Sequence, residues 1–279
     1  MNYFICIFVF FFGLIIGSFI NCVIYRLHAK KSFLRGRSFC PKCKHQLVWY
    51  DNIPVLSFLL LKGKCRYCQK KISIQYPLVE LITGILFIIV FIITIKQFNN
   101  LTILDILLNC SIAQLLMLFR NWVFTAILII IFIYDLKYCL ILDKITIPAM
   151  VIALVLNITV RYMQIGLADK LFYYFIILLF SGVICGGFFL IQFLVSKGKW
   201  IGGGDIRLGF LMGLMLGWPY AIAALFISYI IGSVIGLGLI LSKRKTIKSQ
   251  VPFGTFLGVG TFIALLWGDW IVQKYLNLL

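Results

Sequence analysis

The sequence predicts an all-α polytopic membrane protein with about eight transmembrane helices and one small cytoplasmic loop domain. Hydrophobic residues make up 63% of its 279 residues and the mean hydropathy is +1.08, whereas a soluble domain is about half apolar. Apolar runs recur from one end of the chain to the other, as in a protein that crosses a bilayer many times. A basic segment with paired cysteines lies between the first two runs, and it accounts for the loop domain.

Eight apolar segments are the candidate spans. The first is about 23 residues long and no small-residue cleavage site follows it. It is therefore too long for the core of a signal peptide, and we expect a retained membrane helix. The eight segments are residues 3–25, 77–95, 119–135, 145–162, 171–195, 206–219, 220–242 and 254–275.

The net charge of +18 arises from 26 Lys and Arg residues against 8 acidic ones. In a soluble protein this balance would suggest nucleic acid. Here the basic residues lie between apolar runs, as in cytoplasmic loops, so we expect membrane lipid and no nucleic acid as a partner. Residues 26–75 hold twelve of them and one aspartate. This segment is predicted to be cytoplasmic, and an even number of spans places the basic cluster 242–248 on the same side.

Residues 101–118 are ambiguous because they are apolar enough to form a ninth span. A ninth span would move the basic cluster 242–248 to the outer face, against the charge rule. We therefore expect 101–118 to lie flat at the outer membrane surface as an interfacial helix.

Four of the nine cysteines form two Cys-x-x-Cys pairs, Cys40 with Cys43 and Cys65 with Cys68, separated by 21 residues. This spacing is typical of a four-cysteine zinc site. Two disulfides are disfavoured in a reducing cytoplasm, while an iron–sulfur centre or a redox pair remains an alternative. Four thiolates complete a tetrahedron, so we expect a structural zinc ion whose binding folds the loop.

Two aspartates occupy similar places at the ends of apolar runs. Asp135 ends one run, and Asp205 begins another directly after the glycines 202–204. In the eight-span topology both lie at the cytoplasmic face, and ionisable residues at a span are candidates for function. Two adjacent carboxyl groups titrate as a unit. One can then take a proton from water while the other protonates a scissile carbonyl group.

Each of these features also has a simpler interpretation. Either aspartate could cap a helix or pair with Lys137 or Arg207, but two aspartates on one face favour catalysis. Gly202 and Gly204 are expected to let the chain approach a substrate backbone. Glu80, the only glutamate, lies one turn into the second span. It either interacts with the helix dipole or contacts a cationic group of a substrate, and both interpretations stay open.

Four stretches together resemble the type IV prepilin leader peptidases, bacterial inner-membrane members of the Gly-x-Gly-Asp aspartic proteases. They are residues 17–27, 40–80, 135–148 and 202–209. The resemblance implies that Asp135 and Asp205 are catalytic and that the active site faces the cytoplasm. It also implies cleavage of a short basic leader from prepilins or pseudopilins, followed by N-methylation of the new N-terminal residue with S-adenosylmethionine.

The resemblance assigns the methyltransferase activity to residues 1–95 and the membrane aspartic peptidase to residues 96–279. Two residues depart from the family pattern. Leu142 stands where proline is usual, and Arg207 stands where lysine is common. Asp143, which follows Leu142, is not the expected catalytic residue and Arg207 keeps the charge, so the chemistry is expected to be unchanged. No glycine-rich fingerprint locates a site for S-adenosylmethionine.

Two other functions were weighed against this one. A transporter with the aspartates as ion or proton ligands predicts charges near mid-membrane and repeated halves. Neither pattern occurs in this sequence. A non-catalytic scaffold built on the zinc loop has no need of a glycine–aspartate junction, and it would bind prepilin without processing it.

Overall fold

The computed structural model describes residues 3–32, 36–97, 111–166, 168–242 and 252–278. Across these ranges the regular structure is helical, and strand-like pairing is limited to two isolated bridges, Phe39 with Gln46 and Lys64 with Lys71. The chain divides into two compact units, residues 1–109 and 110–279.

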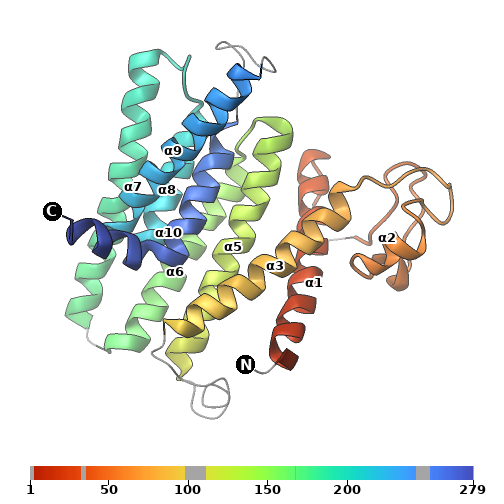
Figure 1. Ribbon diagram of the computed structural model, residues 1–279, viewed down its shortest axis with the longest axis horizontal. Helices are drawn as coiled ribbons and strands as arrows, with labels where there is room; N and C mark the ends of the chain where they lie inside the picture. The colour runs from red at the N-terminus through yellow and green to blue at the C-terminus, as the bar shows by residue number, and fades with distance from the viewer. Residues whose placement is uncertain (1–2, 33–35, 98–110, 167, 243–251, 279) are drawn as a thin grey trace. The chain divides into compact units, whose positions relative to one another are not determined.

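The first unit is a pair of long apolar helices joined by the cysteine-bearing loop (Figure 1). The two long helices are α1 (Tyr3–His28) and α3 (Gln75–Lys96). In its described residues, 29–32 and 36–74, the loop between them contains two short helices, η1 (Trp49–Asn52) and α2 (Leu56–Leu60). Most of the loop therefore has no regular structure of its own.

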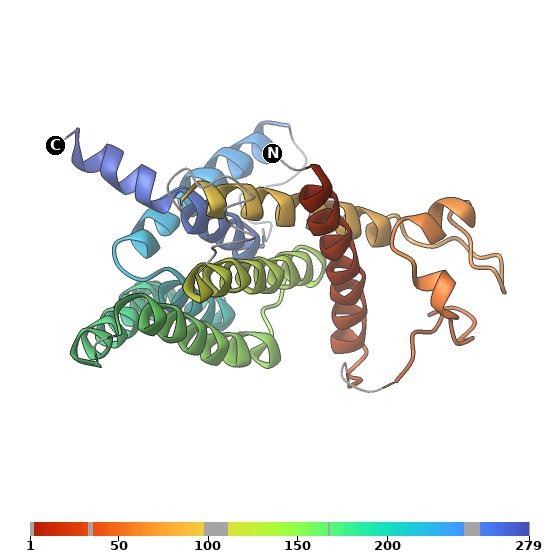
Figure 2. The ribbon, with the colours of Figure 1, turned by 90° about the horizontal axis from the view of Figure 1, so that it is seen from below.

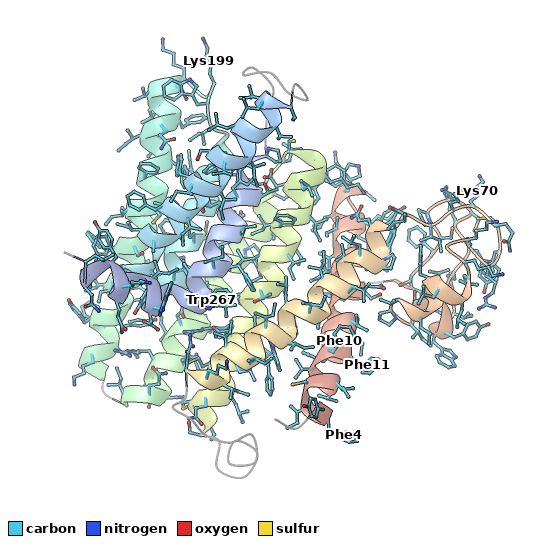
Figure 3. The ribbon with its side chains drawn as sticks, viewed as in Figure 1. Phe4, Phe10, Phe11, Lys70, Lys199 and Trp267 are labelled. Carbon is cyan, nitrogen blue, oxygen red and sulfur yellow. The ribbon has the colours of Figure 1, made fainter. Side chains whose placement is uncertain are left out.

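Small residues bring α1 and α3 together at backbone distance. A Cβ atom on Gly13 would lie 2.7 Å from Gly84 Cα, and one on Gly17 would lie 2.7 Å from Glu80 Cα. Such close approach is typical of helix packing inside membranes. Away from this interface α1 is apolar and exposed, as Phe4 and Phe11 illustrate (Figure 3), so a lipid-facing surface is present.

The second unit is a bundle of six helices, which are also visible in the rotated view of Figure 2. Among the described helices, the short helix α8 packs against α7, α6, α10 and α9, and most of its residues from Leu208 onward are buried. A Cβ atom on Gly213 of α8 would lie 2.5 Å from Gly182 Cα of α7, so these two backbones touch. The helices are α5 (Ile112–Tyr138), α6 (Asp143–Ile165), α7 (Ala168–Ser196), α8 (Gly203–Leu216), α9 (Tyr220–Leu241) and α10 (Phe253–Leu276).

The predicted fold class, an all-α polytopic membrane protein, is confirmed. Among the described residues, seven helices are long and apolar enough to cross a membrane. The remaining predicted span, 206–219, corresponds to α8, which has 14 residues. At 1.5 Å per residue α8 is about 21 Å long, shorter than a hydrocarbon core of about 30 Å.

The expectation of a flat interfacial helix over 101–118 is wrong for its last seven residues. Residues 112–118 belong to α5 and continue directly into the span. The physical reason is a capping box: the Gln114 N–H donates to Ser111 Oγ (3.3 Å), and the Ser111 N–H donates to Gln114 Oε1 (3.1 Å). Residues 101–110 lie outside the described residues, as does the basic cluster 242–248 apart from Ser242.

Candidate functional site

Asp135 lies in the last turn of α5 and is held by a distant helix. Its side chain is buried, and its Oδ2 atom accepts a hydrogen bond from the Thr255 N–H (2.9 Å). Thr255 is in the first turn of α10, where backbone N–H groups have no partner within the helix. A Cβ atom on Gly254 would lie only 2.8 Å from Asp135 Oδ2. The α10 terminus can therefore approach this carboxyl group only because residue 254 is glycine.

Asp205 is held locally, at the start of its own helix. Its buried Oδ2 atom accepts a hydrogen bond from the Gly202 N–H (3.1 Å) just before α8 begins. The helix-capping interpretation is thus correct for Asp205. Pairing with Arg207 is not observed, because Arg207 forms its ion pair with Asp143. The cap occupies one carboxyl oxygen and fixes the direction of the side chain.

The structure brings the two predicted aspartates together in the second unit. They are near enough for the charge of Asp135 to act on Asp205. Ile141, in the segment between α5 and α6, packs against glycines near both aspartates. A Cβ atom on Gly204 would be 2.8 Å from Ile141 Cβ, and one on Gly254 would be 3.0 Å from Ile141 Cδ1. Gly204 and Gly254, each next to a residue that holds one of the carboxyl groups or carries it, thus pack against the same isoleucine.

The three glycines before Asp205 differ in what surrounds them. A Cβ atom on Gly203 would meet nothing within 4 Å, whereas the space beside Gly204 is filled by Ile141. Gly202 supplies the N–H that holds Asp205. Two supporting residues, Gly254 and Ile141, were not predicted from the sequence. The available signal near Gly254 was Pro252 at the start of an apolar run, since proline is common at helix N-termini.

The four paired cysteines form one cluster in the loop of the first unit. The sulfur atoms of Cys40, Cys43, Cys65 and Cys68 all lie within 4.8 Å of one another. A zinc ion with four sulfur ligands at 2.3 Å has sulfur–sulfur distances of about 3.8 Å. The cluster therefore fits a four-thiolate metal ion such as zinc, and it does not resemble two separate disulfides.

The two halves of the cluster have the same backbone pattern. In the first, the Lys44 N–H donates to the Cys40 carbonyl oxygen (2.8 Å), and in the second the Gln69 N–H donates to that of Cys65 (2.9 Å). Lys44 and Gln69 also share a positive φ, 59° and 55°. Each Cys-x-x-Cys pair is thus a tight turn that directs both sulfur atoms to one point.

The thiols of Cys40 and Cys43 influence each other, and their pKa values shift in opposite directions. A backbone hydrogen bond from His45 lowers the pKa of the Cys43 thiol, but burial and hydrogen bonds with Cys40 and Cys68 raise it to about 11. Burial alone would raise the pKa of the Cys40 thiol, but hydrogen bonds from the backbone of Cys43 and Lys42 and from neighbouring cysteines bring it to about 7. Thiolate is the form that binds metal.

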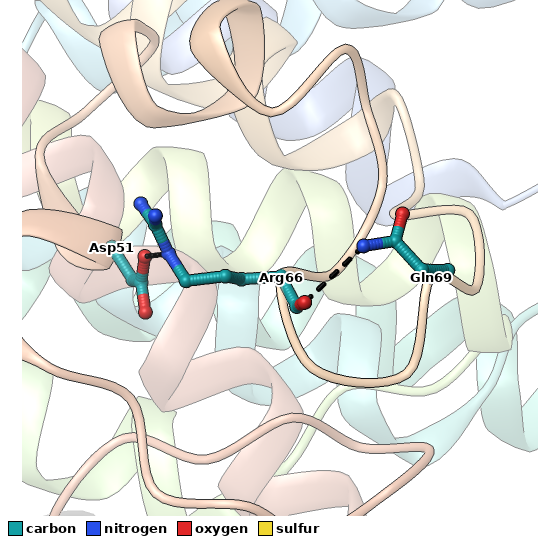
Figure 4. Close-up of polar contacts among 3 residues, drawn as sticks. All are labelled: Asp51, Arg66 and Gln69. Carbon is teal, nitrogen blue, oxygen red and sulfur yellow. Dashed lines mark hydrogen bonds and ion pairs between the residues drawn. The ribbon is translucent and has the colours of Figure 1, made fainter.

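Polar contacts brace the loop around the cluster. Figure 4 shows the Arg66 Nε–H donating to Asp51 Oδ1 (2.9 Å) and the Gln69 amide donating to the Arg66 carbonyl oxygen (3.2 Å). The rings of His45 and Tyr67, one beside each Cys-x-x-Cys pair, have centroids 3.6 Å apart. The single aspartate of the loop is therefore already occupied by one of its basic residues.

Glu80 attaches the loop to the helix pair. Its buried Oε2 atom accepts a hydrogen bond from the Val55 N–H (2.7 Å). Val55 has a φ of 60°, which is unfavourable for a β-branched residue. On the other side of the loop, the buried Arg26 guanidinium donates to the carbonyl oxygens of Gly36 (2.8 Å) and Arg37 (3.1 Å). Two buried charged residues of the spans thus hold the loop backbone.

Comparison with known proteins agrees with these features. The model of the bacterial peptidase A24 N-terminal domain matches residues 11–94, and that of the type IV leader peptidase family matches residues 122–237. The chain is 33% identical to the prepilin leader peptidase/N-methyltransferase of Aeromonas salmonicida (strain A449), covering 96% of this chain and 93% of that protein. It is 30% identical to the protein of that name from Bacillus subtilis (strain 168), covering 96% and 97%. No solved structure matches it significantly. The chain therefore belongs to the type IV leader peptidase family.

Proposed function

We propose that this chain cleaves the short basic leader peptide from type IV prepilins or pseudopilins and then N-methylates the new N-terminal residue. Relatives that match nearly its whole length are named prepilin leader peptidase/N-methyltransferase. The observation that carries the proposal is the buried carboxyl pair, Asp135 and Asp205, each fixed by a backbone N–H group.

In the proposed reaction the carboxyl pair acts as general base and general acid. One carboxylate takes a proton from the attacking water, and the other carboxyl group donates a proton to the scissile carbonyl. The Thr255 and Gly202 N–H groups hold the two side chains in fixed directions. Such preorganisation avoids the cost of orienting the catalytic groups during the reaction.

The surroundings of the three predicted substrate-binding residues, Gly202, Gly204 and Glu80, lead us to propose a different role for two of them. Gly202 keeps its proposed role, because it holds Asp205 and carries no side chain that would cover it. For Gly204, packing against Ile141 replaces a substrate contact as the reason for glycine. For Glu80, we propose a positioning role, because its carboxyl group accepts the Val55 N–H and also bonds to the Ser18 side chain.

The proposed division of labour places the methyltransferase activity in residues 1–95 and the peptidase activity in residues 96–279. Cys40, Cys43, Cys65 and Cys68 would hold a zinc ion that keeps the loop folded. S-adenosylmethionine is the proposed methyl donor. We also propose that the protein lies in the bacterial inner membrane with the carboxyl pair facing the cytoplasm, because the basic loop 26–75 favours that side.

The test is mass spectrometry of a prepilin co-expressed with wild-type protein, Asp135→Asn or Asp205→Asn. Wild type should remove the leader and add the mass of one methylene group to the new N-terminus. Each variant should slow cleavage by about 100-fold or more, since it removes a proton-transfer group. Asp143→Asn is the matched control, because Asp143 lies nearby on α6 but is half-exposed and paired with Arg207.

Two results would contradict the proposal. Cleavage at the wild-type rate by either catalytic variant would exclude the two-carboxyl mechanism. Prepilin that binds the wild-type protein but is never processed, with any pilin-like substrate, would favour the scaffold function.

A further inference from the structure

The short helix α2 presents an apolar face that the described residues of the first unit leave exposed. Leu56, Leu59 and Leu60 are 49%, 64% and 73% exposed. Their spacing of three and four residues places them on one side of the helix. Trp49, a few residues earlier in η1, is 76% exposed as well. Apolar side chains gathered in this way in a lysine-rich loop mark an interaction site.

Contacts within the first unit fix the level of this face relative to the spans. The Val55 N–H, directly before α2, donates to Glu80 Oε2 (2.7 Å). Glu80 is the sixth residue of α3, so its backbone lies about 7 Å inside the start of that helix. The helix therefore begins beside a membrane span and not beyond its end.

The other span of the pair extends further past this contact on the loop side. Gly17 of α1 packs against the backbone of Glu80, and eleven residues of α1 follow it. At 1.5 Å per residue, α1 extends about 16 Å past this contact on the loop side. The contact therefore lies inside the ends of both spans, so α2 begins beside the spans at a depth that the bilayer reaches.

We infer that α2 inserts its leucine face into the bilayer surface, as an interfacial anchor for the cysteine-bearing loop. Side chains suited to lipid flank it on both sides. Trp49 and Tyr50 belong to the residue types that gather at membrane interfaces, and Lys62 and Lys64 follow directly after α2. Apolar side chains between aromatic and basic residues are the pattern of a helix that lies in the plane of the interface.

The charge of the loop favours anionic phospholipid as the partner of the leucine face of α2. Residues 26–75 carry twelve basic residues and one acidic residue, Asp51, which is already paired with Arg66. Anionic phospholipid headgroups attract such a loop, and both of its ends continue into membrane spans, so the bilayer surface is always within its reach. A pilin helix or residues 110–279 of this chain are the alternative occupants, and the experiment separates them from lipid.

The test uses the photoreactive residue p-benzoylphenylalanine in place of Leu60 in the full-length protein. The protein is reconstituted in phosphatidylethanolamine and phosphatidylglycerol vesicles together with a prepilin and irradiated. Crosslinked products are identified by mass spectrometry. Because Leu60 is exposed, the substitution should leave the fold intact, and an unchanged metal content of the purified protein checks this. The same residue at Lys70, on the outer edge of the loop in Figure 3, is the control.

The expected result is a phospholipid adduct at residue 60, at least tenfold more abundant than at residue 70. In vesicles of neutral phosphatidylcholine the yield at residue 60 should fall, because the basic residues lose their attraction. Equal lipid labelling at the two positions would overturn the inference. So would a main product joined to prepilin or to residues 110–279. The readout does not depend on cleavage, so the failure of this inference and the failure of the proposed peptidase activity are distinguishable.

Discussion

The two units hold their candidate sites by different means. In the first unit, polar point contacts fix a loop with little regular structure: four clustered thiols, the Glu80–Val55 hydrogen bond and the Arg26 guanidinium. In the second unit, packed helices fix two carboxyl groups through close backbone approach at Gly254 and Gly204. Replacing one sulfur atom should therefore disrupt the loop of the first unit, whereas adding one methyl group at a glycine should displace a carboxyl group of the second unit.

The most damaging change should be Cys65→Ser, which removes a buried thiol from the proposed metal site. We expect metal affinity to fall by at least about 100-fold, because one of the four proposed ligands is lost. The loop should then unfold, since metal binding is proposed to supply its folding free energy. Methylation should then be lost, while leader cleavage, which depends on the second unit, should remain. Metal content and the masses of the processed pilin measure the two effects.

Cys6→Ser is the control for this variant, since Cys6 lies in α1 outside the cluster. It should keep both the metal and both activities. If cleavage disappears together with methylation in Cys65→Ser, the two activities are not separable in the way that the comparison implies.

Gly254→Ala should have the opposite effect. The new Cβ atom would lie 2.8 Å from Asp135 Oδ2, so the carboxyl group or the start of α10 must move. A displacement of about 1 Å in a catalytic group can cost about 100-fold in rate, and we expect cleavage to fall by that order with the metal content unchanged. The measurement is the rate of leader removal by purified protein.

Gly258→Ala is the matched control one turn further along α10. There the nearest atom to an added Cβ, the Leu128 carbonyl oxygen, is 3.9 Å away. This variant should cleave at nearly the wild-type rate. Equal losses in both variants would mean that α10 tolerates no larger residue anywhere, and the contact with Asp135 would then not be the cause.

Gly204→Ala should be harmful to a lesser degree, because the added Cβ meets Ile141 Cβ at 2.8 Å and reaches Asp205 only indirectly. Overpacking of this kind costs about 1–3 kcal/mol of stability, and we expect cleavage to fall about tenfold, which corresponds to about 1.4 kcal/mol. Thermal unfolding in detergent and the cleavage rate measure both effects. Gly203→Ala, where the added Cβ meets no atom within 4 Å, should change neither, and a comparable loss there would refute the steric explanation.

The sequence was sufficient for features that depend on local spacing. The described helices agree with the predicted spans to within a few residues at most ends, because long apolar runs specify them. The two Cys-x-x-Cys pairs predicted one cluster, since each pair forms its own turn. The hydrogen bond between Gly202 and Asp205 is equally local. The start of α5 at Ile112, which was predicted at residue 119, also had a local signal, the capping box of Ser111 and Gln114.

Features that depend on tertiary packing were not predictable. The partner of Asp135 is Thr255, 120 residues away, and only the packing of α10 against α5 brings them together. The hydrogen bond from Val55 to Glu80 exists only once the loop is folded. Ile141 gave no signal, because an isoleucine among apolar residues does not reveal that two glycines will pack against it.

The smallest effect is expected for the ion pair between Arg207 and Asp143, whose side chains are 47% and 49% exposed. Exposed ion pairs contribute about 0–1 kcal/mol, so Asp143→Asn and Arg207→Gln should each change stability by less than that and leave cleavage unchanged. A double-mutant cycle on thermal stability measures the coupling. Asp143 is an aspartate of the same unit, but it lacks burial and a backbone donor in the described structure. If Asp143→Asn slowed cleavage as strongly as Asp205→Asn, burial and fixation by backbone amides would not be what distinguishes the two proposed catalytic aspartates.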